Sequence, residues 1–169
     1  PMKRLALMIL TGAAVLTGLP MAAQTEAAAS EETPPAPEQT VIERWLADHT
    51  TVFDASEVTL ADLEWIARPV VVFADSPNQP QFIEQMRLLQ DDLSELDIRD
   101  VIIIADTDPD GGSDARRILR PRGFSLVLVD KDGRVNFRKP DPWSVREITR
   151  QIDKMPLRLQ EIRDRLGQG

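Results

Sequence analysis

Two continuous apolar runs, separated by one helical pattern, constrain the fold of this chain most strongly. Residues 69–74 read Pro-Val-Val-Val-Phe-Ala, and residues 101–105 read Val-Ile-Ile-Ile-Ala. Their length and β-branched composition are typical of buried central strands. Between them, apolar residues recur at spacings of four and three from Phe82 to Leu96, which predicts a helix of about four turns. A right-handed crossover of this kind joins two parallel strands.

The second half of the chain predicts a hairpin and two more helices. Residues 124–129 form a third apolar run, and Lys131-Asp132-Gly133 is typical of a tight turn into residues 134–137. Ser144 and Glu147 make a capping-box pattern before an apolar helix face. A final helix begins at Pro156 and is expected to place three apolar residues on one side: Leu159, Ile162 and Leu166. Residues 115–119 predict a short helix between the second and third strands. The order β-α-β-α-β-β-α then indicates an α/β protein, a thioredoxin-like three-layer α/β/α sandwich with a mixed sheet.

Shorter patterns extend this scheme. Val41, Trp45 and Leu46 suggest a short amphipathic helix, and residues 59–62 suggest a capped turn. We expect Trp65, just before the first strand, to lie in the core.

The N-terminus has the pattern of a secretory signal peptide, assigned to residues 1–23. Lys3 and Arg4 precede an apolar stretch from Leu5 to Leu19, and small residues at 22–23 suit cleavage. The stretch is shorter than the roughly 20 residues that span a bilayer, although a retained anchor is the alternative. We therefore expect an exported protein, periplasmic or secreted, of a Gram-negative bacterium.

Residues 24–40 are rich in alanine, glutamate and proline and have no apolar periodicity. Such a segment cannot bury enough apolar surface to offset its ordering entropy, so we interpret it as a disordered linker. A recognition strand in polyproline conformation is the alternative. The folded domain is then assigned to residues 41–169.

Charge narrows the classes of partner. The chain has a formal net charge of −8 and a sequence pI of about 4.7. A general nucleic-acid binder needs a basic face, and an anionic membrane repels an acidic protein. We expect neither partner once the signal peptide is removed, and the remaining candidates are a periplasmic protein or an anionic ligand.

The segment from about Phe53 to Arg163 resembles the domain of unknown function 4174 family. Three stretches carry the resemblance: residues 63–73, with Leu-Glu-Trp before Arg-Pro-Val-Val-Val-Phe; residues 126–133; and residues 152–158, Ile-Asp-Lys-Met-Pro-Leu-Arg, followed by Glu161 and Arg163. The resemblance implies a thioredoxin- or peroxiredoxin-like fold in an exported protein, with relatives among vertebrate extracellular proteins of the sushi-repeat-containing and coiled-coil-domain-containing-protein-80 type. It implies no settled activity.

Thiol chemistry is excluded because the chain contains no cysteine. In a thioredoxin-like fold, the reactive thiolate stands at the start of the first crossover helix, where free N–H groups lower its pKa. Residues 76–79 occupy that place and read Ser-Pro-Asn-Gln. The helix start could hold an anion, but Ser76 and Asn78 are equally suited to capping it. His49, the single histidine, has no evident catalytic partner.

An acidic loop is the sharpest local motif. Carboxylates alternate ahead of Gly111, as in a calcium loop, at Asp106, Asp108 and Asp110. Asp114 follows the glycine, at the ninth position of such a loop, where a further ligand would stand. However, the twelfth position holds Arg117 instead of an acid, and a strand precedes the loop where a calcium hand has a helix. Calcium is the only cofactor that the sequence suggests, and a solvated acidic loop is the alternative.

A basic cluster follows this loop: Arg116, Arg117, Arg120 and Arg122. Local charge compensation is one interpretation, and a binding patch for an anionic partner is the other. Two functions therefore stay open. The first is a non-enzymatic binding or structural module in the periplasm, and the second is an enzyme with non-thiol, metal-assisted chemistry at residues 106–114. The balance favours the first, and no catalytic residue is assigned.

Overall fold

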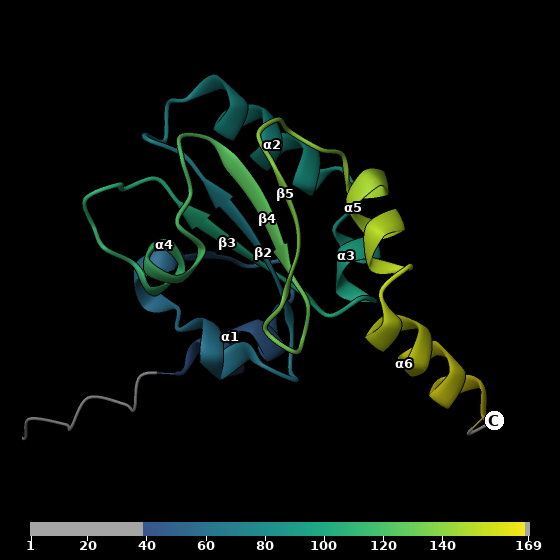
Figure 1. Ribbon diagram of the computed structural model, residues 1–169. Helices are drawn as coiled ribbons and strands as arrows, with labels where there is room; N and C mark the ends of the chain where they lie inside the picture. Colours follow the sequence, from purple (N-terminus) through teal and green to yellow (C-terminus); the bar gives the residue numbers. More distant parts are fainter. Residues whose placement is uncertain (1–38, 168–169) are drawn as a thin grey trace, which may run out of the picture. The chain divides into compact units, whose positions relative to one another are not determined.

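The computed structural model describes residues 39–167, in which a mixed five-stranded sheet is covered by helices on both faces (Figure 1). The strand order is β1-β3-β2-β4-β5. The strands are β1 (Val52–Asp54), β2 (Arg68–Phe73), β3 (Val101–Asp106), β4 (Ser125–Val129) and β5 (Val135–Lys139). β3 is parallel to β1 and β2, whereas β4 is antiparallel to β2 and β5. The expected signal peptide and all but the last two residues of the expected linker lie outside the described residues.

Alternation along the central strands divides the core into two layers. Val71, Ile102 and Val127 point to one face of the sheet, while Val70, Ile103 and Leu126 point to the other. Because β2, β3 and β4 are buried on both faces, their sequences are continuously apolar rather than alternating. The thioredoxin-like α/β fold expected from the sequence is confirmed by this topology.

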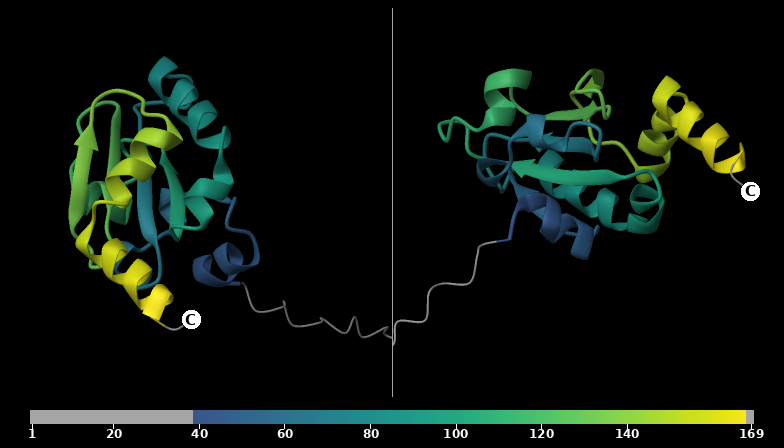
Figure 2. Two further views of the ribbon diagram at one scale, coloured as in Figure 1. Left: turned by 90° about the vertical axis from the view of Figure 1, so that its right-hand side faces the viewer. Right: turned by 90° about the horizontal axis from the view of Figure 1, so that it is seen from below.

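The two layers of helices are α1 (Val41–Ala47) and α4 (Asp114–Leu119) on one face, and α2 (Pro80–Gln90), α3 (Leu93–Asp97) and α5 (Val145–Ile152) on the other. Two 3₁₀ turns, at Ala55–Glu57 and Leu60–Leu63, pack with α1. The last helix, α6 (Pro156–Gly167), extends beyond one end of the strands instead of covering a face (Figure 1, Figure 2). None of the helices among residues 39–167 is both long and apolar enough to cross a membrane.

Capping boxes fix two helix starts. The Ser144 hydroxyl accepts the Glu147 N–H, and the Glu147 carboxylate accepts the Ser144 N–H, as the sequence predicted. The same reciprocal pair between Thr40 and Glu43 begins α1. Each box satisfies backbone donors that a helix start leaves free.

Three expectations about secondary structure and burial are wrong. The helix expected over residues 82–96 is two helices, because the Asp92 side chain caps a new start by accepting the Glu95 N–H. β1 was not predicted, because its three residues include one buried side chain, Phe53. On α6, Leu159 and Leu166 are exposed, while the buried side chain is Arg158.

Trp65 was expected in the core, and this expectation is wrong. Its side chain is 67% exposed, whereas Trp45 is 2% exposed. Trp65 adopts a left-handed φ of 65°, and its N–H donates to the Lys131 carbonyl at 2.7 Å. This turn conformation directs the indole away from the core, which an apolar pattern along the sequence does not reveal.

Candidate functional site

The end of the sheet where β2 and β3 finish is the place where a thioredoxin-like fold would carry its thiol. β2 leads through Ala74 and Asp75 into residues 76–79, and α2 begins at Pro80. Gln79 is the N-cap, and its side-chain carbonyl accepts the Asp75 N–H at 2.9 Å. Neither Ser76 nor Asn78 caps the helix as expected, because Gln79 holds that position.

His49 is held between α1 and α3. Its ring stacks on Trp45 with centroids 4.3 Å apart, and Nδ1 pairs with the Asp97 carboxylate. The histidine therefore joins two structural elements and faces no nucleophile among its contacts.

Asp106 and Arg116 form a buried ion pair at the ends of β2 and β3. The Asp106 side chain is 3% exposed, and Oδ1 accepts from Arg116 Nε at 2.6 Å. The same guanidinium donates to the Ala74 carbonyl at 2.7 Å and lies over the Phe73 ring, 5.5 Å from its centroid. The Ser113 hydroxyl donates to the other Asp106 oxygen. Arg116 thus ties the two strand ends together.

The other loop carboxylates are engaged separately. Asp114 accepts the Leu60 N–H at 3.0 Å and pairs with Arg117. Asp108 accepts the Asp110 N–H at 3.1 Å, within the loop itself. Across residues 39–167, no three histidine, cysteine or acidic side chains are grouped so that they could hold a metal ion. Asp54, Asp106 and Asp108 line one hollow of about 280 Å³, but each of these carboxylates already accepts hydrogen bonds from its own surroundings.

Calcium should leave the stability of the protein unchanged. A ligand that binds only the native state raises its melting temperature by mass action. Because Asp106 and Asp114 already hold Arg116, Arg117 and backbone donors, we expect no shift at millimolar calcium, measured by differential scanning calorimetry against magnesium at equal ionic strength. A saturable rise in the melting temperature with calcium, absent in Asp108→Asn, would instead support a metal site in the loop.

Three arginines surround a polar hollow at this same end of the sheet. Its lining is Arg120, Arg122, Phe124, Ser125, Arg138 and Pro140, and its volume is about 310 Å³. We call this feature the arginine hollow. Arg120 is the C-cap of α4 at a φ of 47°, and its N–H donates to the Arg116 carbonyl at 2.9 Å. Arg138, on β5, donates to the Leu119 carbonyl at the end of α4.

The guanidinium groups of the arginine hollow have no carboxylate partner within residues 39–167. Eight other arginines in this part of the chain form ion pairs: Arg44, Arg68, Arg87, Arg99, Arg116, Arg117, Arg134 and Arg158. The four arginines that are close in the sequence therefore fall into two pairs. Arg116 and Arg117 form ion pairs with Asp106 and Asp114, whereas Arg120 and Arg122 line the hollow.

Arg138 is the member of the arginine hollow that sequence reasoning missed. It lies opposite Val127 in the β4–β5 ladder, on the face of the sheet that α4 covers. The hairpin turn at residues 131–133 was predicted, but the register that carries Arg138 to the end of α4 depends on a shift between Leu128 and Val129. An irregularity of this kind has no reliable signal in one sequence.

The opposite end of the sheet holds a buried ionic cluster around Arg68, whose side chain is fully buried. Arg68 Nε donates to Asp130 at 3.0 Å, and a terminal nitrogen donates to Glu161 at 2.8 Å. Its other terminal nitrogen donates to the Arg99 carbonyl at 2.9 Å. Lys131 Nζ lies 3.2 Å from the same Glu161 carboxylate. Arg68 therefore connects the start of β2, the end of β4 and α6.

The α5–α6 junction is fastened by the same ionic cluster. Arg99 donates two hydrogen bonds to Asp153, at 2.9 and 2.8 Å, and Arg158 donates to Glu161 at 3.3 Å. Arg158 Nε is buried without a hydrogen bond, 3.8 Å from an Asp153 oxygen. Within the unusual stretch at residues 152–158, Asp153 therefore binds Arg99 and lies beside Arg158 at the start of α6.

Acid should weaken the attachment of α6. Burial opposes ionisation of Glu161, but hydrogen bonds and charge from Arg68 and Lys131 outweigh it and lower its pKa from 4.5 to about 2. The native state therefore binds a proton less readily than the unfolded chain, and the stabilisation present above pH 4.5 is lost as the pH falls toward 2. We expect the melting temperature to fall more steeply over this range in the wild type than in Glu161→Gln, and equal slopes would contradict this assignment.

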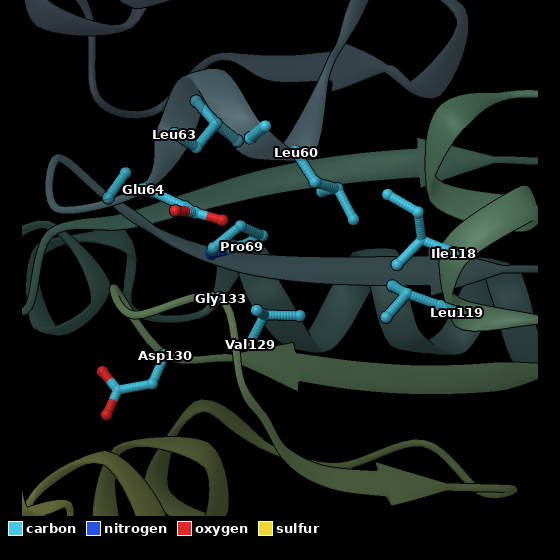
Figure 3. A pocket seen from close by; sticks show the side chains of 11 residues that line it. Leu60, Leu63, Glu64, Pro69, Ile118, Leu119, Val129, Asp130 and Gly133 are labelled. Carbon is cyan, nitrogen blue, oxygen red and sulfur yellow. The ribbon is translucent and has the colours of Figure 1, made fainter.

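A small apolar hollow of about 100 Å³ lies between a 3₁₀ turn, α4 and β4 (Figure 3). Leu60, Ile118, Leu119 and Val129 surround it, and the Asp130 carboxylate points away toward Arg68. Glu64 is the other acidic residue of the lining, so the two carboxylates of the hollow do not form a pair against a common centre.

Solved structures similar to this chain include a thioredoxin and a thioredoxin peroxidase. The solved structure of chloroplastic thioredoxin z is 23% identical with a TM-score of 0.48, covering 62% of this chain and 96% of that one. Thioredoxin peroxidase I of Plasmodium yoelii is 19% identical with a TM-score of 0.41, covering 57% of this chain and 76% of that one. A search of curated proteins gave no match.

The family model described as a domain of unknown function, DUF4174, matches residues 59–161. The match spans more than half of the chain and ends at Glu161, the partner of Arg68 on α6. It includes the acidic loop and all three arginines of the hollow, Arg120, Arg122 and Arg138. The chain therefore belongs to the DUF4174 family.

Proposed function

We propose that this domain is a non-enzymatic module that binds an anionic partner through the arginine hollow. The observation that carries the proposal is that three arginines without a carboxylate partner line one hollow of the described chain, and that no acidic side chain lines it with them. In an acidic protein, such a local concentration of positive charge attracts and orients anions.

The surroundings of the arginine hollow favour binding over catalysis. Residues 76–79 carry no thiol, and the nearby Asp106 carboxylate is neutralised by Arg116. His49 is occupied by Trp45 and Asp97. An acid–base or nucleophilic mechanism needs a free titratable group placed against a reacting atom, and these groups are committed to structural contacts.

The module is proposed to act in the periplasm or outside the cell, after cleavage near Ala22 or Ala23. Mass spectrometry of the protein recovered from a periplasmic extract should find a mature N-terminus close to Gln24. A chain that begins at Met2 in exported material would contradict cleavage.

Anion binding can be tested by thermal unfolding of the full chain. At constant ionic strength, we expect polyanions such as heparin or polyglutamate to raise the melting temperature, whereas neutral dextran leaves it unchanged. The rise should disappear in Arg120→Gln/Arg122→Gln. The matched control is Arg163→Gln/Arg165→Gln, which removes the same charge from exposed positions on α6.

Two results would contradict the proposed function. One is the absence of a shift with every anion in the panel. The other is an equal loss of the shift in both double variants, which would mean that net charge, and not the arginine hollow, controls binding.

A further inference from the structure

We infer that the arginine hollow recognises a phosphate group carried on an organic molecule, a phosphate monoester. The inference rests on the proposed function, because it names the chemistry of the anion that the hollow takes. Its basis is the number, origin and surroundings of the three guanidinium groups.

The charge of the arginine hollow suits a dianion. Arg120, Arg122 and Arg138 bring three positive charges, and no acidic side chain lines the hollow. A carboxylate presents one charge and two oxygens, which would leave most of these donors unused. A phosphate monoester presents up to two charges and three terminal oxygens, and guanidinium groups bind such oxygens in a bidentate manner.

Contacts within the fold position one of the donors before any ligand arrives. The Arg138 guanidinium is held by its hydrogen bond to the Leu119 carbonyl, and the backbone of Arg120 is fixed at the left-handed C-cap of the same helix. The Arg138 guanidinium therefore needs little ordering when a ligand binds. Preorganised donors retain more of their interaction energy as affinity.

The size and lining of the arginine hollow indicate the organic group. Its volume of about 310 Å³ leaves room for more than the five heavy atoms of a phosphate ion. Phe124 and Pro140 provide apolar walls beside the guanidinium groups. Burial of an apolar substituent against these walls adds to affinity in proportion to the area covered. A free phosphate ion would leave these walls in contact with water.

Isothermal titration calorimetry of the full chain tests this inference with three probes: phenyl phosphate, inorganic phosphate and benzenesulfonate. We expect phenyl phosphate to bind more tightly than inorganic phosphate, which lacks the ring, and than benzenesulfonate, which lacks the second charge. Loss of one charge-assisted contact in Arg122→Gln should weaken phenyl phosphate binding about tenfold or more. Arg163→Gln, the matched control at the opposite end of the sheet, should bind as the wild type does.

Each alternative outcome is decisive. Tighter binding of inorganic phosphate than of phenyl phosphate would assign the site to the free ion and overturn the monoester. Equal binding of benzenesulfonate and phenyl phosphate, or equal weakening by Arg122→Gln and Arg163→Gln, would overturn phosphate recognition at this site. Absence of phosphate binding together with stabilisation by polyglutamate would overturn this inference while leaving the proposed function intact.

Discussion

Arg68→Ala is expected to destabilise the domain by about 3–5 kcal/mol, because it leaves buried carboxylates without their counter-charge. Arg68 is fully buried and contacts Asp130 and Glu161 at 3.0 and 2.8 Å. Removal of one member of a buried ion pair costs more than the pair contributes, since the remaining charge stays desolvated. Chemical denaturation monitored by circular dichroism measures the loss.

Arg87→Ala is the control for Arg68→Ala. Arg87 also pairs with two acids, Glu84 and Asp91, but all three side chains are about half exposed. Solvent screens exposed ion pairs and they contribute little, so this variant should lose much less stability than Arg68→Ala. A comparable loss in the two variants would mean that the ionic cluster around Arg68 does not hold the fold together.

Trp45→Ala should cost about 3–5 kcal/mol, the range for removing a large aromatic side chain from a core. Trp45 is 2% exposed, and its indole N–H donates to the Val101 carbonyl at 3.3 Å. The same substitution removes the ring on which His49 stacks. Urea denaturation of the purified variant gives the change in the free energy of unfolding.

Trp65→Gly provides the matched comparison for Trp45→Ala. Trp65 is mostly exposed, and its left-handed φ of 65° is a conformation that glycine adopts readily. Relief of backbone strain therefore offsets the lost side-chain contacts, and we expect a change smaller than about 1 kcal/mol. If Trp65→Gly proved as damaging as Trp45→Ala, the indole of Trp65 would have to be covered by a partner in solution.

The central sheet could be predicted because its strands have strong local signals. β2, β3 and β4 are continuous apolar runs, and this pattern has few other solutions at such lengths. β1 has only three residues, too few for a period to appear, and it is defined by its pairing with β3. The break between α2 and α3 depends on one side chain, Asp92, while the apolar face continues across it.

The candidate site was predicted only in part, because a charge pattern does not reveal which charges are already paired. Arg116 and Arg120 look equivalent along the sequence, yet one neutralises Asp106 and the other faces the arginine hollow. Arg138 lies at the site because of the register between β4 and β5, and this register depends on the folded structure. Similarly, Glu161 and residues 152–158 were visible as an unusual stretch, but their role needed the position of Arg68.

The two ends of the sheet have different roles. At the end where β2 begins, the ionic cluster around Arg68 stabilises the attachment of α6. At the end where β2 finishes, residues 76–79 contain no cysteine, and the arginine hollow lies beside them. Ligands of open α/β sheets bind beyond the carboxyl ends of the parallel strands, and the arginine hollow lies at this end.

A nuclear magnetic resonance titration of the ¹⁵N-labelled full chain with phenyl phosphate would show where this ligand binds. We expect saturable shifts confined to backbone amides around Arg120, Arg122 and Arg138, with no change at residues 76–79 or on α6. Shifts centred on residues 76–79 would contradict this expectation, because binding would then occur at the start of α2 and the arginine hollow would have no part in it.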